Sequence, residues 1–255
     1  MKAALIQATL IWENAEANRK HFQQMIDSII ESVDLIVLPE MFTTGFSMAP
    51  EHAGETMEGE TVRWMKALAR SKNAAVTGSV IIVENAKFYN RLLFVHPSGE
   101  IHTYDKRHLF SLAGEDKVYT KGQQRLIIDY RGFRICPLVC YDLRFPVFSR
   151  NTENFDVLLY VANWPKPRIN AWDALLKARA IENMCYVIGV NRVGEDANNH
   201  NYIGHSQAFD FLGNPLCGVT EKETVLIAEM QKGPMLDVRA KMSFLDDRDR
   251  FDIVF

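Results

Sequence analysis

The order of apolar and polar residues predicts an alternation of strands and helices in the first part of the chain. Residues 2–8 and 34–40 are short, nearly continuous apolar runs, as expected for strands that are covered on both faces. Residues 16–33 and 59–72 instead carry apolar side chains at helical spacing, so each is expected to form a helix with one buried face. The residues expected on these inner faces are Phe22, Met25, Ile26, Ile29, Ile30 and Val33 in the first helix, and Val62, Met65, Leu68 and Ala69 in the second.

Apolar runs that predict strands dominate the rest of the chain. Pro-Ser-Gly at 97–99 and Arg-Gly at 131–132 are turn signals that join neighbouring runs into hairpins. A further turn is expected at Gly-Asn, 213–214, between the last two strands. The segment 107–124 has weak periodicity and is expected to be a long loop, which in compact domains is often functional. The expected strands cover residues 74–83, 90–96, 101–106, 125–130, 133–140, 156–163, 185–194, 205–211 and 223–230.

Two more helices complete the expected set of elements. Residues 170–184 form the third helix in this interpretation, and residues 235–244 form a short last one. Because helices and strands alternate first and strands then follow in runs, the pattern predicts a layered α/β fold with two sheets between helical layers. No linker or internal repeat divides the chain, so residues 1–255 are expected to form a single domain. The residues expected on the inner face of the third helix are Trp172, Leu175, Leu176 and Ile181.

Composition excludes several classes of protein. Of the 255 residues, 47% are apolar and 24% are charged, which is typical of a soluble globular protein and excludes a disordered chain. The formal net charge is −3, so no basic excess points to a nucleic-acid partner. No apolar run approaches the ~18 residues that a membrane helix needs. The N-terminus lacks the long apolar region of a signal peptide, and cysteines are sparse, so we expect a cytoplasmic protein with reduced thiols.

The cysteines and histidines do not predict a metal site. Cys136 and Cys140 are the only close pair of cysteines, and neither a second cysteine pair nor a histidine pair stands at ligand spacing. The seven histidines are scattered along the sequence, and no HExxH motif occurs. We therefore expect no metal.

Three of the expected strands end abruptly in a reactive side chain: Glu40, Lys106 and Cys140. Because ligand sites of α/β sheets lie beyond strand ends, these three side chains are candidates for one site. Each also has an ordinary interpretation: Glu40 as a solvated loop carboxylate, Lys106 as part of a charged turn, and Cys140 as a buried core thiol. At Cys140 the chain passes from a strand into YDLRFP, where a partial positive field, strengthened by a nearby lysine, would favour the thiolate. The other cysteines, Cys136, Cys185 and Cys217, are expected to be core thiols.

Three motifs around these residues resemble the nitrilase superfamily, the carbon–nitrogen hydrolases. The motifs are LPEMF at 38–42, YDKRHLF at 104–110 and VCYDLRFP at 139–146. Their order matches that family, and so do the separations of 66 and 34 residues between the three candidate side chains. The resemblance implies a four-layer α-β-β-α sandwich, a Glu-Lys-Cys catalytic triad and homodimers that extend the sandwich across their interface.

The resemblance also implies roles for individual residues. Cys140 would attack the amide carbon, with Glu40 as general base, and Lys106 with the backbone N–H of Tyr141 would stabilise the oxyanion. Glu115, in the loop after the lysine, stands where many family members carry a second glutamate that orients the lysine or the substrate. This chemistry requires no metal and no organic cofactor.

Later segments are similar to the branch of bacterial omega-amidases, which hydrolyse the side-chain amide of 2-oxo acids such as 2-oxoglutaramate. The segments are ANWPKPR at 162–168, ARAIEN at 178–183, GVNRVGED at 189–196 and YIGHSQAFDFLG at 202–213. The substrate of such an enzyme is a small-molecule amide with a carboxylate. Arg168 is a candidate to bind that carboxylate. Trp164 and Phe42, each just past a strand, are candidates for the pocket walls, with ordinary packing as the alternative for Trp164.

Several other interpretations stay open at this point. The triad is the same in nitrilases and N-carbamoyl amide hydrolases, so it does not separate these enzymes from amidases. A binding protein that kept the fold and lost the chemistry is a second class, against which the retention of all three triad residue types argues. A serine hydrolase would rest on GHSQA at 204–208, but this segment departs from G-x-S-x-G and lies inside a strand pattern.

Overall fold

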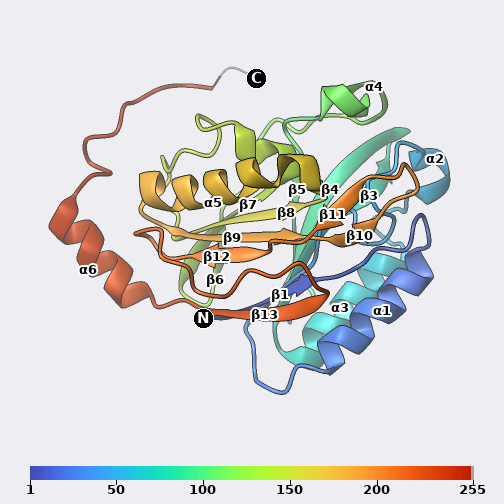
Figure 1. Cartoon of the computed structure of the whole chain (residues 1–255), viewed down its shortest axis with the longest axis horizontal. Helices are drawn as coiled ribbons and strands as arrows, with labels where there is room; N and C mark the ends of the chain where they lie inside the picture. The colour runs from blue at the N-terminus through green and yellow to red at the C-terminus, as the bar shows by residue number, and fades with distance from the viewer. Residues whose placement is uncertain (254–255) are drawn as a thin grey trace.

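Two β-sheets lie face to face between outer helices in the computed structural model, which describes residues 1–253 (Figure 1). Across the first sheet the strands run β13 (Thr224–Glu229), β1 (Lys2–Gln7), β2 (Leu35–Val37), β3 (Ala75–Glu84), β4 (Lys87–Val95) and β5 (Ile101–Asp105). Across the second they run β12 (Gln207–Phe209), β9 (Tyr186–Asn191), β8 (Val157–Ala162), β7 (Phe133–Val139) and β6 (Ile128–Tyr130). A separate ribbon pairs β10 (Val193–Glu195) with β11 (Asn201–Ile203).

Helices cover both outer faces and complete the expected four-layer α-β-β-α sandwich. The helices α1 (Ala15–Asp27) and α3 (Glu60–Lys72) pack on the first sheet, and α5 (Ile169–Asn183) packs on the second (Figure 1). The last helix, α6 (Lys232–Met242), buries Met235 in the core beside the second sheet. All four expected inner residues of α3 are buried, as the helical spacing predicts.

The central strands of each sheet are parallel and buried on both faces. In the first sheet β1, β2 and β3 are parallel, and in the second β7, β8 and β9 are. Successive side chains of β2 point to opposite faces: Leu35 and Val37 join the core between the sheets, and Ile36 joins the cluster beneath α1 and α3. Burial on both faces explains why these strands are continuous apolar runs in the sequence.

Two helical predictions were wrong in detail. The first helix ends at Asp27, where the N–H of Ser28 bonds to the carbonyls of Gln24 and Ile26, so it stops six residues before the expected end. Ile30 is therefore fully exposed. In α5, Ile181 is also exposed, because Trp172, Leu176 and Ala180 occupy the inner face at a spacing of four residues.

Two loop predictions and the expected burial of one cysteine also need correction. The turn at 213–214 does not join β12 to β13. It folds Pro215 back against Phe209, and β13 pairs with β1 in the other sheet. Cys217, in the same stretch, is only partly buried and is not a full core thiol.

The segment 107–124, expected to be a long loop, contains two helical turns, η1 (Ser111–Ala113) and α4 (Glu115–Val118). The remaining short helices are α2 (Pro50–Ala53), η2 (Cys140–Arg144) and η3 (Lys166–Arg168).

Candidate active site

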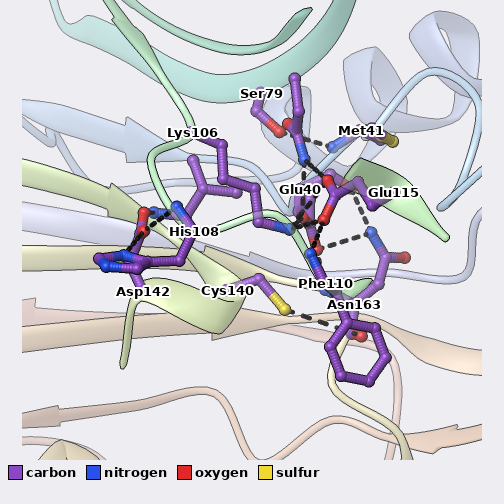
Figure 2. Close-up of polar contacts among 12 residues, drawn as sticks. Glu40, Met41, Ser79, Lys106, His108, Phe110, Glu115, Cys140, Asp142 and Asn163 are labelled. Carbon is purple, nitrogen blue, oxygen red and sulfur yellow. Dashed lines mark hydrogen bonds and ion pairs between the residues drawn. The ribbon is translucent and has the colours of Figure 1, made fainter. Parts of the chain in front are cut away.

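Glu40, Lys106 and Cys140 come together at one end of the sandwich, where β2, β5 and β7 end (Figure 2). The ammonium of Lys106 donates to Oε1 of Glu40 at 2.9 Å. The backbone N–H of Asn163 donates to Oε2 of Glu40 at 2.9 Å, and Sγ of Cys140 lies 4.0 Å from the carbonyl oxygen of Asn163. Residues that are 66 and 34 positions apart in the sequence thus form one cluster.

Glu115 lies on the other side of the lysine. Nζ of Lys106 lies 3.0 and 2.9 Å from the two carboxylate oxygens of Glu115. The side-chain amide of Asn90 on β4 donates to Glu40 at 2.8 Å and to Glu115 at 3.2 Å, so one NH₂ group bridges both carboxylates. The backbone N–H of Phe110 donates to the second oxygen of Glu115 at 2.5 Å. Two carboxylates therefore share one ammonium. The side chains of Glu40, Lys106 and Glu115 are almost completely buried from solvent.

A glycine allows the loop that carries Glu115 to return to β5. The N–H of Gly122 donates to the carbonyl of Lys106 at 3.0 Å. A Cβ at this position would lie 2.0 Å from the carbonyl oxygen of Asp105, which is closer than any side chain tolerates. The close approach explains why a glycine follows Glu115 at this point of the loop.

The charges of the cluster fix its protonation state. Burial alone would lower the pKa of Lys106, but the negative charges of Glu115 and Glu40 outweigh burial and raise it. Burial raises the pKa of Glu115, partly offset by Lys106. The pKa of the Cys140 thiol is well above its usual value because of desolvation and the charge of Glu40. The sequence argument that the lysine and the strand end would favour the thiolate was therefore wrong, because burial and the charge of Glu40 outweigh the lysine.

A short carboxylate network holds Cys140 at the end of β7. Cys140 has a left-handed backbone, φ 45°, at the start of η2. Asp142, buried two residues later, accepts hydrogen bonds from the N–H of Val139 at 2.9 Å and from the hydroxyl of Tyr104 at 2.8 Å. It also contacts His108 through the backbone N–H at 3.0 Å and Nδ1 at 2.7 Å (Figure 2). Asp142 thus ties the turn that carries Cys140 to the loop that follows Lys106.

A cavity of about 600 Å³ opens onto the cluster. Trp164 and Arg168 line it, and Tyr141 lies at its wall next to Cys140, in the first turn of η2. Phe42 does not line it, contrary to expectation. Its ring is fully buried against Phe22 and Trp64 beneath α1 and α3. The other residues with large or charged side chains around the cavity are Trp12, Glu13, Phe46, Met48, Phe110, Arg144, Asp196, His200 and Tyr202.

Two arginines face this cavity. The guanidinium carbon of Arg168 lies 5.3 Å from the centre of the Phe110 ring, and the indole N–H of Trp164 donates to the backbone carbonyl of Arg168 at 2.8 Å. The second, Arg144, stacks over Trp164 at 4.8 Å. Sequence reasoning missed Arg144, although it stands four residues after Cys140 in the third motif. The walls thus carry aromatic rings and charges of both signs, since Glu13 and Asp196 line the cavity as well as the two arginines.

The serine of GHSQA lies elsewhere. Ser206 is buried. Its Oγ accepts a hydrogen bond from the N–H of Asn191 at 3.0 Å and donates one to the carbonyl of Asn191 at 3.1 Å. It is not among the residues that line the cavity. The geometry therefore gives the serine-hydrolase interpretation no support.

Comparison with known proteins agrees with the class of enzyme that this site defines. Residues 2–239 match the family model "Carbon-nitrogen hydrolase", and the chain belongs to that family. It is 44% identical over 252 residues to "Omega-amidase YafV" of Escherichia coli K12, with 98% of each chain covered. It is 32% identical to "2-oxoglutaramate amidase" of Bacillus subtilis 168, with 95% of each covered. The crystal structure of XC1258 from Xanthomonas campestris, a CN-hydrolase superfamily protein with an arsenic adduct in its active site, superposes with a TM-score of 0.97 at 41% identity, covering 100% of this chain and 99% of that one.

Proposed function

We propose that this protein is an omega-amidase, which hydrolyses the terminal amide of 2-oxo acid monoamides such as 2-oxoglutaramate and 2-oxosuccinamate to the 2-oxo acid and ammonia. Similarity over almost the full chain to proteins named omega-amidase and 2-oxoglutaramate amidase carries this proposal. The cavity adds support, because Arg144 and Arg168 line it together with Cys140, and a guanidinium is a suitable partner for a substrate carboxylate.

In the proposed mechanism, Glu40 removes the proton of Cys140 as the sulfur attacks the amide carbon. A general base is needed because the raised pKa keeps the thiol protonated at neutral pH. The ammonium of Lys106 and the backbone N–H of Tyr141 stabilise the oxyanion, and Glu115 holds Lys106 in place through its two short contacts.

Collapse of the tetrahedral intermediate breaks the C–N bond. Glu40 delivers its proton to the leaving nitrogen, ammonia departs and a thioester to Cys140 remains. Glu40 then removes a proton from a water molecule, whose oxygen attacks the thioester carbon. The C–S bond breaks, the 2-oxo acid leaves, and the proton held by Glu40 returns to sulfur. All these steps use residues of the cluster at the ends of β2, β5 and β7.

A comparison of substrates tests the proposal. We expect kcat/KM to be highest for 2-oxoglutaramate and 2-oxosuccinamate, lower for glutamine, and lowest for a nitrile, measured as ammonia release. Good turnover of a nitrile or an N-carbamoyl amine without turnover of 2-oxoglutaramate would replace the proposal with a nitrilase or carbamoyl hydrolase. No turnover of any compound would favour a binding protein that has kept the fold.

Arg168 is the candidate for the substrate carboxylate in this scheme. Replacement of Arg168 by Ala removes a charge-assisted hydrogen bond of about 1.5–3 kcal/mol. We therefore expect kcat/KM for 2-oxoglutaramate to fall about ten- to a hundredfold, and to fall much less for a small uncharged amide. Arg63→Ala is the matched control, because Arg63 is an exposed arginine on α3, away from the cavity. Equal losses for charged and neutral amides would reject Arg168 as the carboxylate ligand, and Arg144 would be tested next.

We further propose a single domain over residues 1–255, of which 254–255 lie outside the described part, and a homodimer in the cytoplasm. All four cysteines are free thiols in the structure, as in reducing compartments. No helix within residues 1–253 is long and apolar enough to cross a bilayer. Light scattering after size exclusion would test the dimer: a mass near 29.2 kDa for the particle would contradict it.

A further inference from the structure

A second group of potential ligands lies on the hairpin formed by β4 and β5, at the end away from the cavity. One ligand atom from each of His96, Glu100 and His102 lies within 4.8 Å of the others. None of these three residues lines the cavity. Arg91 pairs with Asp105 at the end of the hairpin nearer Lys106, so the group stands at the opposite end of β5. His102 is about 14 Å from Lys106 along an extended strand.

The register of the hairpin explains why these residues meet. Phe94 pairs with His102, and the N–H of His96 donates to the carbonyl of Glu100 at 2.8 Å, so His96 lies directly opposite Glu100. Side chains at alternate positions of a strand share a face, and directly opposite and diagonal neighbours are within reach of long side chains. All three side chains therefore project from one face of the hairpin. A search for cysteine pairs or a helical HExxH motif does not detect such a set.

The imidazole of His96 has an unused nitrogen at this place. Nε2 of His96 is buried, and within residues 1–253 no protein group forms a hydrogen bond with it. Its ring packs edge-on against Phe94 and Tyr130 and lies 5.1 Å from the ring of His102. An unpaired buried nitrogen is uncommon and calls for a partner.

We propose that His96, Glu100 and His102 bind a divalent transition-metal ion, with zinc as the best match. Imidazole and carboxylate are both zinc ligands, and three protein ligands leave the remaining position to water. Two ligands of one zinc ion lie about 3.4 Å apart at a tetrahedral angle. Nε2 of His102 and Oε1 of Glu100 are already 3.3 Å apart, and the Glu100 side chain is exposed. The ion has a structural role here, because it ties the turn at 97–99 to both strands, remote from the reacting thiol.

Titration of the protein with zinc chloride, followed by calorimetry, tests this site. The experiment is done in the Cys140→Ala background, so that the thiol in the cavity does not bind zinc. We expect one ion per chain, with the affinity at least tenfold lower in His96→Gln and in His102→Ala. His52→Ala is the matched control, since His52 is an exposed histidine on α2, and it should bind zinc unchanged. Zinc at a tenfold or greater excess over its Kd should raise Tm by ~2–4 °C, and EDTA should reverse the shift.

Three outcomes would overturn the proposal. One is the absence of saturable binding at micromolar zinc. The second is binding of equal strength in both histidine variants and in the control. The third is a Tm that zinc leaves unchanged although the ion binds, which would mean that the unfolded chain binds zinc as tightly as the folded one. His96→Gln keeps the size of the side chain, so a folded variant is available even if His102→Ala proves unstable.

Discussion

Replacement of Cys140 by alanine is expected to lower the rate of amide hydrolysis by roughly 10⁴-fold or more, because no other group in the cluster can form the thioester. The buried carboxylates and Lys106 would remain in place, since they are held by one another, by Asn90 and by the backbone N–H of Asn163. Substrate binding should therefore persist while turnover is lost. Ammonia release measures the turnover. The intact mass after iodoacetamide treatment identifies the reactive thiol, because the variant should carry one label fewer than the wild type.

Cys136→Ala is the matched control. Cys136 lies four residues earlier on β7, is fully buried in the core and does not line the cavity. Its loss should cost about 1 kcal/mol of unfolding free energy and leave most of the activity. If Cys140→Ala turned over substrate near the wild-type rate, the covalent mechanism would be wrong whatever Cys136→Ala did.

The sequence was sufficient to predict the three central residues of the cluster for a physical reason. Glu40, Lys106 and Cys140 each stand at the end of a predicted strand, and such strand ends meet at one end of a sandwich. Asn90 and Asn163 were not predicted. Asn90 lies inside a strand, and Asn163 contacts Glu40 through both its backbone N–H and its side-chain amide, but neither has a local pattern that distinguishes it from an ordinary polar residue.

Long-range packing decided the remaining differences. Phe42 stands two residues after Glu40, but Met41 between them has a left-handed backbone. The ring of Phe42 therefore lies in the core beneath α1 and α3, close to Gly78. Ile30 fits the helical spacing of the first helix, yet the chain leaves the helix at Ser28 to enter β2. These outcomes depend on the direction that the chain takes toward the next element, and the periodicity of apolar residues contains no information about that direction.

Replacement of Lys106 by methionine is expected to abolish activity and to lower the free energy of unfolding at pH 8 by about 3–5 kcal/mol. Methionine has a similar length and fills the space, so the loss is one of charge. Without the ammonium, Glu40 and Glu115 are two fully buried carboxylates that share the amide of Asn90 and otherwise accept only from neutral N–H donors of Asn163 and Phe110. Lys66→Met is the control: Lys66 is exposed on α3, and its replacement should change stability by less than about 0.5 kcal/mol.

The pH dependence of that loss distinguishes buried charge from lost packing. Burial already raises the pKa of Glu115 in the folded protein, and removal of Lys106 removes the attraction that opposes this rise. A carboxyl group whose pKa is higher in the folded than in the unfolded chain takes up a proton on folding, so its destabilising effect grows as pH rises through the folded pKa and disappears as pH falls toward the unfolded pKa. In the wild type, Lys106 has a raised pKa and stays charged throughout this range, so its contribution is constant.

The difference in unfolding free energy between wild type and Lys106→Met, measured with urea, should therefore be large at pH 8 and clearly smaller at pH 5. Addition of Glu115→Gln to the variant should recover stability at pH 8, because one buried charge is then gone. A difference that is equal at both pH values, or a double variant less stable than the single one, would show that the lysine acts there through packing and not through its charge.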